Sequence, residues 1–283
     1  ACATTLAQRG HAVTLFEQAN EIGGQFNLAK RIPGKEEFAE PMRYWGNLMD
    51  ELGVEVRLGT CATIESLRGF DAVILATGVT PRALAIPGTN HAKTLSYLDV
   101  VLHGKPVGKR VAIIGAGGIG FDVAEFLTQS APSSTTDISR WSYEWGVDQK
   151  YTNAGGLAKP APEPSPREVW LLQRTPSKPG KRLHKTTGWV HRAALKMKNV
   201  QMLGGVTYER IDDAGLHFTI DGKPQIFEVD NVIVCAGQEP RRDLYDGLRS
   251  AGIDVRLIGG ADVAAELDAK RAIEQGTRLG AML

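Results

Sequence analysis

The chain has 283 residues, 42% of them hydrophobic, which is enough for about two globular domains. Its 33 basic and 32 acidic side chains leave a formal charge of +1, which argues against a nucleic-acid or membrane-surface partner. No apolar run reaches the roughly 18 residues of a membrane-spanning helix, and no signal peptide is visible. The three cysteines are scattered, so they predict no redox disulfide and no local metal site, and they suit a reducing cytoplasm.

The first predicted elements are typical of the second half of a βαβ unit. Residues 1–9 predict a helix that ends at Gly10, and residues 11–17 predict a short strand that ends in an acid. The helix has neither an N-cap residue nor an initiator methionine before it. We therefore expect a truncated piece, in which the first strand of the unit and its glycine loop would have preceded Ala1.

The next elements continue this first domain. Residues 36–52 predict an amphipathic helix, because apolar side chains recur there at helical spacing. Residues 54–58 and 71–76 predict two strands, and the second of these ends at Thr77-Gly78.

A second βαβ unit is predicted in the middle of the chain. Residues 110–114 predict a buried strand, the glycine loop GAGGIG follows, and residues 121–127 continue as a helix. Residues 168–172 predict the second strand of this unit. Residues 130–166, between the two strands, are rich in Ser, Thr, Pro and aromatic side chains. We expect them to form a long loop or insertion that packs on something.

The glycine loop is the strongest local motif. Gly115 allows the tight turn after the strand, Gly117 lets the backbone approach a pyrophosphate, and Gly120 lets helix and strand pack closely. The helix N-terminus offers free N–H groups to the phosphates. Since the loop has a strand before it and a helix after it, we expect dinucleotide binding rather than a purely structural turn.

The end of the second strand indicates which dinucleotide is bound. An acid there would hold the ribose 2′-hydroxyl of NAD, but the strand ends at Gln173 and Arg174. A cation can accommodate a 2′-phosphate, so we expect Arg174 to favour NADP. Further cations follow at Lys178, Lys181, Arg182 and Lys185, but each of them is better explained as part of a solvated basic loop.

The C-terminal third begins with strands and ends with a helix. Residues 206–234 alternate apolar and polar side chains and predict an antiparallel β-meander. Residues 232–235 form a strand that ends at Ala236-Gly237, as the earlier strand ends at Thr77-Gly78. Residues 255–258 predict the last strand and residues 261–275 the last helix.

Three features predict a second nucleotide site, for a flavin. Glu17 ends its strand where an acid that holds a ribose should lie, although an ordinary exposed Glu would look the same. Gly24 and Gln25 follow it in a stretch with two glycines, which lets the backbone run close to a nucleotide. Asp262 either stabilises the start of the last helix or accepts a hydrogen bond from a ribityl chain.

The repeated strand endings predict a nested α/β fold with two Rossmann-like dinucleotide-binding domains. Each domain is expected to have three layers around a parallel sheet, and the fold is expected to include an antiparallel β-meander. Residues 1–96 and 232–283 would be the two segments of an FAD-binding domain whose first strand is missing. Residues 97–231 would be an inserted NADP-binding domain.

Several stretches together resemble a known family, the bacterial-type NADPH-dependent 2,4-dienoyl-CoA reductases. These are relatives of trimethylamine dehydrogenase and of old-yellow-enzyme reductases. The two most specific stretches are KTTGWVHR and VIVCAGQEPRRDL. The others are EIGGQFNLAKRIPGKEEF, ILATGVTPR, VAIIGAGGIGFDVAEFL and IGGADVAAELDAKRAIEQGTRL. Together they cover essentially the whole chain.

The resemblance implies the C-terminal, FAD- and NADPH-binding half of such an enzyme. Glu17, Gly24, Gln25 and Asp262 would contact FAD, and the glycine loop with Arg174 would hold NADPH. An N-terminal barrel with FMN, the catalytic acid and a 4Fe–4S cluster would lie in the missing part. Electrons would pass from NADPH through FAD and the cluster to FMN, which reduces the unsaturated acyl-CoA during β-oxidation. The piece alone should not reduce a dienoyl-CoA.

Other functions stay open. Within the same class, the chain could belong to another enoate reductase or to an amine dehydrogenase, although the latter needs no NADPH site. A disulfide reductase would need a paired cysteine motif. In other classes, it could be a non-catalytic nucleotide-binding module, or a docking domain that uses residues 130–166.

Overall fold

The computed structural model describes residues 1–130, 132–265 and 267–283. The chain forms two compact units, and each is assembled from separate stretches of sequence. Unit 1 comprises Ala1–Asn27, Phe38–Arg82 and Gln238–Leu283, and unit 2 comprises Leu28–Glu37 and Ala83–Gly237. The chain therefore passes from unit 1 into unit 2 and back twice. No helix among the described residues is both long and apolar enough to cross a membrane.

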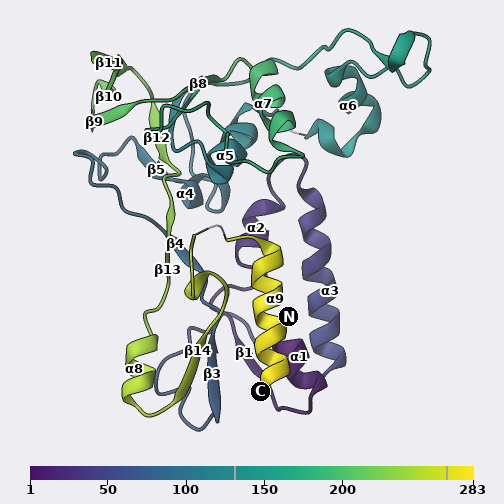
Figure 1. Ribbon diagram of the computed structural model, residues 1–283, viewed down its shortest axis with the longest axis vertical. Helices are drawn as coiled ribbons and strands as arrows, with labels where there is room; N and C mark the ends of the chain where they lie inside the picture. The colour runs from purple at the N-terminus through teal and green to yellow at the C-terminus, as the bar shows by residue number, and fades with distance from the viewer. Residues whose placement is uncertain (131, 266) are drawn as a thin grey trace. The chain divides into compact units, whose positions relative to one another are not determined.

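Unit 1 contains three two-stranded sheets and the helices that pack on them (Figure 1). The strands are β1 (Thr14–Phe16), β2 (Glu55–Arg57), β3 (Ala72–Leu75), β4 (Val79–Pro81), β13 (Gln238–Pro240) and β14 (Asp254–Leu257). β1 pairs with β2 and β14 with β3, both in parallel, whereas β13 and β4 are antiparallel. The helices are α1 (Cys2–Gln8), α3 (Ala39–Glu51), α8 (Tyr245–Ser250) and α9 (Ala269–Met282), with a 3-10 turn, η4 (Gly259–Ala261).

Helices α1 and α9 lie side by side, so the two ends of the chain are neighbours (Figure 1). Two glycines one turn apart on α9 make this close approach possible. A Cβ at Gly280 would lie 2.9 Å from the Cβ of Thr5, and one at Gly276 would lie 3.3 Å from the nitrogen of Cys2.

Gly280→Val should therefore push α1 away from α9. We expect the free energy of unfolding to fall by about 1–3 kcal/mol, the usual cost of overpacking. The matched control is Ala281→Val at the next, exposed position, which should cost less than about 0.5 kcal/mol. Denaturant unfolding of both variants checks this, and equal losses would show that the helix contact is not tight.

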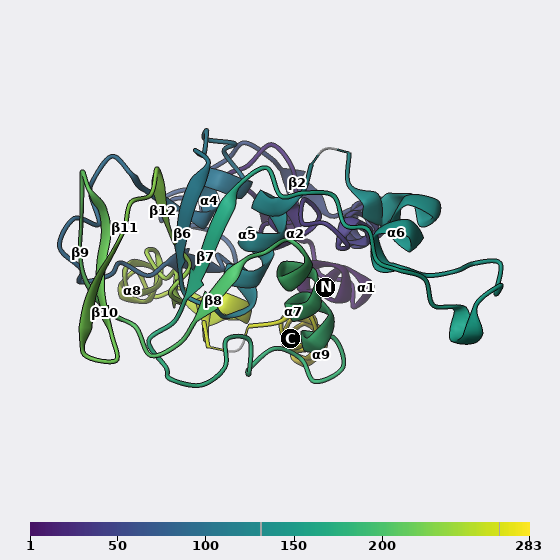
Figure 2. The same cartoon turned by 90° about the horizontal axis from the view of Figure 1, so that it is seen from above.

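Unit 2 is built on a five-stranded parallel sheet in the order β5-β12-β6-β7-β8 (Figure 2). Its strands are β5 (Thr94–Ser96), β6 (Arg110–Ile114), β7 (Glu168–Leu172), β8 (Gln201–Leu203) and β12 (Asn231–Val234). A second, antiparallel sheet contains β9 (Thr207–Asp212), β10 (Gly215–Ile220) and β11 (Lys223–Phe227). The helices are α4 (Tyr97–Val101), α5 (Gly118–Thr128), α6 (Ile138–Trp145) and α7 (Gly188–Met197).

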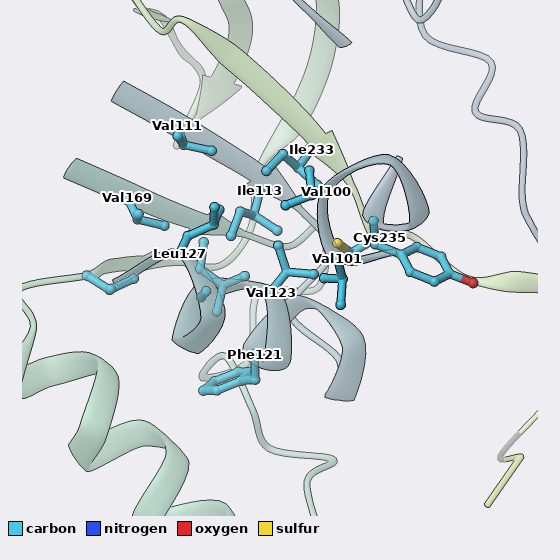
Figure 3. Close-up of a cluster of buried hydrophobic side chains, with 14 of the residues drawn as sticks. Val100, Val101, Val111, Ile113, Phe121, Val123, Leu127, Val169, Ile233 and Cys235 are labelled. Carbon is cyan, nitrogen blue, oxygen red and sulfur yellow. The ribbon is translucent and has the colours of Figure 1, made fainter. Parts of the chain in front are cut away.

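The parallel sheet of unit 2 lies between two layers, because its central strands are apolar on both faces. On one face, Val111 and Ile113 of β6 belong to the same buried cluster as Val123 and Leu127 of α5 (Figure 3). On the other face, Ala112 and the rest of the alternate positions pack against the antiparallel sheet. This arrangement confirms the predicted Rossmann-like α/β fold with three layers.

The two short strands β4 and β13 lie where the chain leaves and re-enters unit 1. Pro240 is aligned with Val79 and Gln238 with Pro81 in their antiparallel ladder. The structure thus pairs the segments that follow the two similar strand endings noted in the sequence. Two short elements span the changes of unit in the N-terminal part, α2 (Gln25–Ala29) and the 3-10 turn η1 (Glu36–Phe38).

The boundaries of the units differ from the expected domain boundaries. Unit 2 begins at residue 83 rather than 97 and ends at residue 237 rather than 231, because β5 and β12 both belong to its sheet. The stretch Leu28–Glu37 also belongs to unit 2, since Leu28 and Ile32 are buried in its core. No local sequence pattern indicates that Leu28–Glu37 belongs to unit 2, because its place there depends on contacts with residues distant in sequence.

Three predicted elements need correction. The meander ends with β11, and residues 231–234 form a strand of the parallel sheet instead. The last helix begins at Ala269 and not at residue 261, because Asp268 caps it with a 2.7 Å hydrogen bond from the Arg271 amide. The stretch 130–166, apart from residue 131, which lies outside the described residues, contains α6 and two 3-10 turns, η2 (Ser134–Thr136) and η3 (Ala154–Gly156).

The aromatic side chains of this insertion are only partly packed. Trp141 and Trp145 stack on each other one turn apart on α6, with ring centroids 5.7 Å apart. Tyr143 is 70% exposed and Tyr151 is 82% exposed. The insertion contacts another part of the unit through the ion pair of Glu144 with Lys198, whereas the two tryptophans stack on each other and the two tyrosines are exposed.

Candidate functional site

The glycine loop of unit 2 follows β6 and leads into α5. Gly115 has a φ of +111°, which disfavours any residue with a side chain. A Cβ there would also lie 2.5 Å from the carbonyl oxygen of Cys235. At Gly120, a Cβ would overlap the carbonyl oxygen of Gly115. These two glycines are therefore required by the close packing of strand, loop and helix.

Gly117 has a different environment. It is exposed, and a Cβ built on it or on Gly118 would meet no described atom within 4 Å. Open space thus remains above the loop where the backbone is bare. Gly117 is also the N-cap of α5, so the first N–H groups of the helix lie beside this space without partners inside the helix.

The charge around the start of α5 favours an anion. The first turn of α5 carries no acidic side chain, and its helix dipole places partial positive charge there. The geometry of the loop therefore fits a diphosphate, as the sequence motif predicts. The three loop glycines have distinct positions: Gly115 and Gly120 are fixed by packing, and Gly117 faces open space.

Arg174 lies two residues after the end of β7, the parallel neighbour of the strand β6 that leads into the glycine loop. Its side chain is exposed and makes no hydrogen bond or ion pair with any described residue. It is close enough to Tyr208 for its charge to oppose the rise that burial causes in the pKa of that phenol. A free guanidinium at this place fits the predicted contact with a 2′-phosphate.

The basic segment after Arg174 folds back toward α5. Gly180 is buried, and a Cβ there would lie 2.7 Å from the ring of Phe121, which follows the last loop glycine. Lys181 and Arg182 come next and are exposed. All four cations of the segment, Lys178, Lys181, Arg182 and Lys185, are exposed, as expected of a solvated basic loop, while Gly180 in its middle packs against α5.

A partly buried histidine–carboxylate pair joins α5 to α7. His191 Nδ1 lies 2.7 Å from Glu125 Oε1, and the Glu125 side chain is only 10% exposed. Burial raises the pKa of the Glu125 carboxyl, and the hydrogen bond to Glu125 raises the pKa of His191. Lys35 and Asp122, which form a 2.6 Å ion pair, also act on both groups.

The pair should make the stability of the chain depend on pH. Because the pKa of His191 is higher in the folded chain, its contribution is complete below about pH 6.5 and is lost as the pH rises through the folded value. The raised pKa of Glu125 acts in the same direction. We expect the stability difference between wild type and His191→Gln to shrink from pH 6 to pH 9 in denaturant unfolding. Glu125→Gln should abolish this trend, and a difference that stays constant with pH would disprove it.

In unit 1, Glu17 follows the last residue of β1. Its carboxylate Oε1 accepts a 2.8 Å hydrogen bond from the Ala19 amide, and its main chain bonds to Arg57 of the neighbouring strand. The residue is therefore held at the end of a parallel strand, half-buried, where a ribose acid is expected.

The two glycines that follow also differ in their roles. Gly23 has a φ of +127°, and a Cβ there would lie 2.6 Å from Met42 Sδ. Gly24 and Gln25 are exposed, and a Cβ at Gly24 would meet no described atom within 4 Å. Next to them, Asn27 is 5% exposed, and its Oδ1 has no hydrogen-bond partner among the described residues. The bare backbone at Gly24 and Gln25 fits the close approach of a nucleotide, whereas the unsatisfied Asn27 oxygen is enclosed by protein.

Asp262 follows the short turn η4 after β14. Its Oδ2 accepts a 2.7 Å hydrogen bond from Gln275 Nε2, and Gln275 Oε1 accepts one of 2.7 Å from the Gly259 amide. It borders a cavity of about 280 Å³ together with Val263, Arg271, Glu274, Gln275 and Arg278. The helix α9 begins seven residues after Asp262. Asp262 therefore does not stabilise the start of that helix, and this one of its two predicted roles is wrong.

The site residues thus fall into two groups. Glu17, Gly24, Gln25 and Asp262 belong to unit 1, and the three loop glycines with Arg174 belong to unit 2. Sequence reasoning missed the packing of the basic segment on α5. The Pro179-Gly180 pair, which interrupts the run of cations, is the local signal that could have indicated it.

The cysteines offer no redox pair. Cys2 is partly buried, Cys61 is exposed and Cys235 is buried, and all three are free thiols. Burial raises the pKa of the Cys235 thiol far above its usual range, which disfavours a reactive thiolate. Among residues 1–130, 132–265 and 267–283, no three His, Cys, Asp or Glu side chains gather as a metal site would require.

Two curated relatives align with nearly the whole chain. A metal reductase from Desulforamulus reducens is 26% identical over 92% of this chain and 39% of that protein. A cinnamate reductase from Clostridium sporogenes is 26% identical over 92% of this chain and 34% of that protein. The chain therefore spans less than half the length of these relatives.

Among solved structures, a complex of 2-naphthoyl-CoA reductase has the same fold with a TM-score of 0.81. It is 24% identical, and the alignment covers all of this chain and 38% of that one. The family described as pyridine nucleotide-disulphide oxidoreductase matches residues 1–271. That match implies binding of FAD and NAD(P), in agreement with the two bare glycine segments. The chain belongs to the pyridine nucleotide-disulphide oxidoreductases, although its three cysteines are all free thiols.

Proposed function

We propose that the chain is the FAD- and NADPH-binding reductase part of a 2,4-dienoyl-CoA reductase. The observation that carries the proposal is the exposed Gly117 at the start of α5, after β6, together with the unpaired Arg174 after the neighbouring strand β7. When both nucleotides are bound, NADPH supplies a hydride and FAD accepts it. The protein's own residues bind and orient these two nucleotides.

Each unit would hold one nucleotide. In unit 2, the amides at the start of α5 would bind the diphosphate of NADPH, and Arg174 would bind its 2′-phosphate. In unit 1, Glu17 would accept hydrogen bonds from the FAD ribose, Gly24 and Gln25 would lie along the nucleotide, and Asp262 would accept from the ribityl chain.

The substrate class rests on the family resemblance and on the relatives. Cinnamate and 2-naphthoyl-CoA are both conjugated acids or thioesters, as a dienoyl-CoA is, and the proteins named for them share this fold or sequence. Those proteins are much longer than this chain. A further part, with FMN, a 4Fe–4S cluster and the catalytic acid, would reduce the acyl-CoA in the cytoplasm. An amine dehydrogenase is less well supported, because a site for ADP alone needs no free Arg174.

Anaerobic titration of the FAD-loaded chain with NADPH tests the proposal. We expect NADPH to bleach the flavin absorbance and NADH to do so only at about tenfold or higher concentration. Arg174→Ala should remove this difference. The chain should not turn over a 2,4-dienoyl-CoA by itself. If neither nucleotide binds, a docking module is the better assignment. Turnover of the dienoyl-CoA would refute the proposal that a further part of the protein reduces the acyl-CoA.

A further inference from the structure

The side chain of Gln173 turns back onto its own main chain. Its Nε2 donates hydrogen bonds to the carbonyl oxygen of Thr175 at 2.9 Å and to that of Ser177 at 2.6 Å. Gln173 is the first residue after β7, where an acid would select NAD. Its amide hydrogens are therefore used to fold the turn of residues 173–177.

The same turn is fixed from its other side by the start of the next segment. The Gly205 amide donates to the Thr175 carbonyl and the Val206 amide to the Gln173 carbonyl, both at 3.1 Å. A Cβ at Gly204 would lie 2.7 Å from the Ser177 oxygen, so the two segments touch. The side chain at position 173 therefore faces carbonyl oxygens, which favours a residue that donates hydrogen bonds.

Arg174 projects from this turn between two anchored neighbours. Its backbone is held by the bonds of Gln173 on one side and of Thr175 on the other, while its side chain is exposed. A guanidinium on a fixed turn loses less conformational entropy when it binds a phosphate than one on a mobile loop. The turn thus prepares Arg174 for a bound anion.

We propose that Gln173 is a positioning residue that sets the preference for a 2′-phosphorylated dinucleotide by folding the turn that carries Arg174. The inference rests on the proposed NADPH site. A Glu at position 173 would place a carboxylate against two carbonyl oxygens, which opens the turn. It would also restore the acceptor that a ribose 2′-hydroxyl requires. The cofactor preference therefore depends on an amide as well as on a cation.

The test compares the dissociation constants of NADPH and NADH for the full 283-residue chain and its variants. Gln173→Met removes the donors at similar size, Gln173→Glu replaces them with acceptors, and Arg174→Met removes the cation. Gln201→Glu, at an exposed position on the neighbouring strand β8, is the charge-matched control. Melting temperatures without nucleotide report whether each variant folds.

We expect Gln173→Met to weaken NADPH binding about tenfold while NADH binding changes by less than about twofold. Gln173→Glu should remove the preference or reverse it, and Gln201→Glu should keep it. If Gln173→Met weakens both nucleotides equally, or keeps the wild-type preference while Arg174→Met loses it, the inference is overturned and the proposed function stands. Loss of folding in both Gln173 variants would also overturn it. A wild type without preference, or an Arg174→Met variant that keeps it, would instead defeat the proposed NADPH site.

Discussion

Gly117→Val is expected to abolish NADPH binding while the chain remains folded. The backbone at Gly117 has a φ of −88° and a ψ of −170°, which any residue adopts, and no described atom lies within 4 Å of a Cβ built there. A valine side chain would fill the open space beside the first turn of α5. If two charge-assisted hydrogen bonds to the diphosphate are lost, at about 1.5–3 kcal/mol each, affinity should fall at least about a hundredfold.

Gly120→Val is the matched comparison. There the new Cβ would overlap the carbonyl oxygen of Gly115 and approach Leu171 Cδ1 at 3.3 Å. We expect this variant to lose stability by more than about 1–3 kcal/mol, because backbone cannot move aside as a flexible side chain can. Calorimetric titration and thermal melting of both variants separate the two roles. A Gly117→Val variant that binds NADPH normally would show that the diphosphate lies elsewhere.

Lys198→Met is expected to have the largest effect on stability. Lys198 Nζ lies 3.3 Å from Glu144 Oε1, and the two side chains are only 7% and 6% exposed. Glu144 also accepts a 2.6 Å hydrogen bond from Ser134. Removing the cation would leave a carboxylate buried without its counter-charge, which typically costs about 3–5 kcal/mol.

The ion pair ties the insertion of residues 130–166 to the end of α7, because Lys198 also donates a 2.8 Å hydrogen bond to the Glu163 carbonyl. The double variant Glu144→Gln with Lys198→Met removes both charges of this pair. It should recover most of the loss in denaturant unfolding, whereas Arg278→Met, at an exposed i,i+4 pair, should change little. Equal losses in the single and the double variant would contradict this account of the insertion.

The parts of the fold that the sequence predicts best are those whose signals are local. β6 and β7 lie at the predicted residues, because each is a continuous apolar run buried on both faces. The glycine loop and the start of α5 follow from the positions of three glycines. The α6 helix also has local signals, namely Asp137 at its N-cap and Gly146 in the left-handed conformation after its end. The aromatic and polar composition of the segment favoured a loop in the sequence analysis, so these signals were missed.

The parts that the sequence does not reveal depend on tertiary contacts. Leu28–Glu37 joins unit 2 through the ion pair of Lys35 with Asp122 and the hydrogen bond of Glu36 with Thr135. The partners lie far apart in sequence. Likewise, the absence of an acid at the end of β7 is visible in the sequence, but the use of the Gln173 amide is visible only in coordinates.

The most direct test of the central claim is a crystal structure of the chain with NADPH. The account predicts that the diphosphate lies against the Gly117 amide and the first turn of α5, with the 2′-phosphate beside Arg174. A dinucleotide bound away from this loop, or an open loop that stays empty at saturating NADPH, would contradict it.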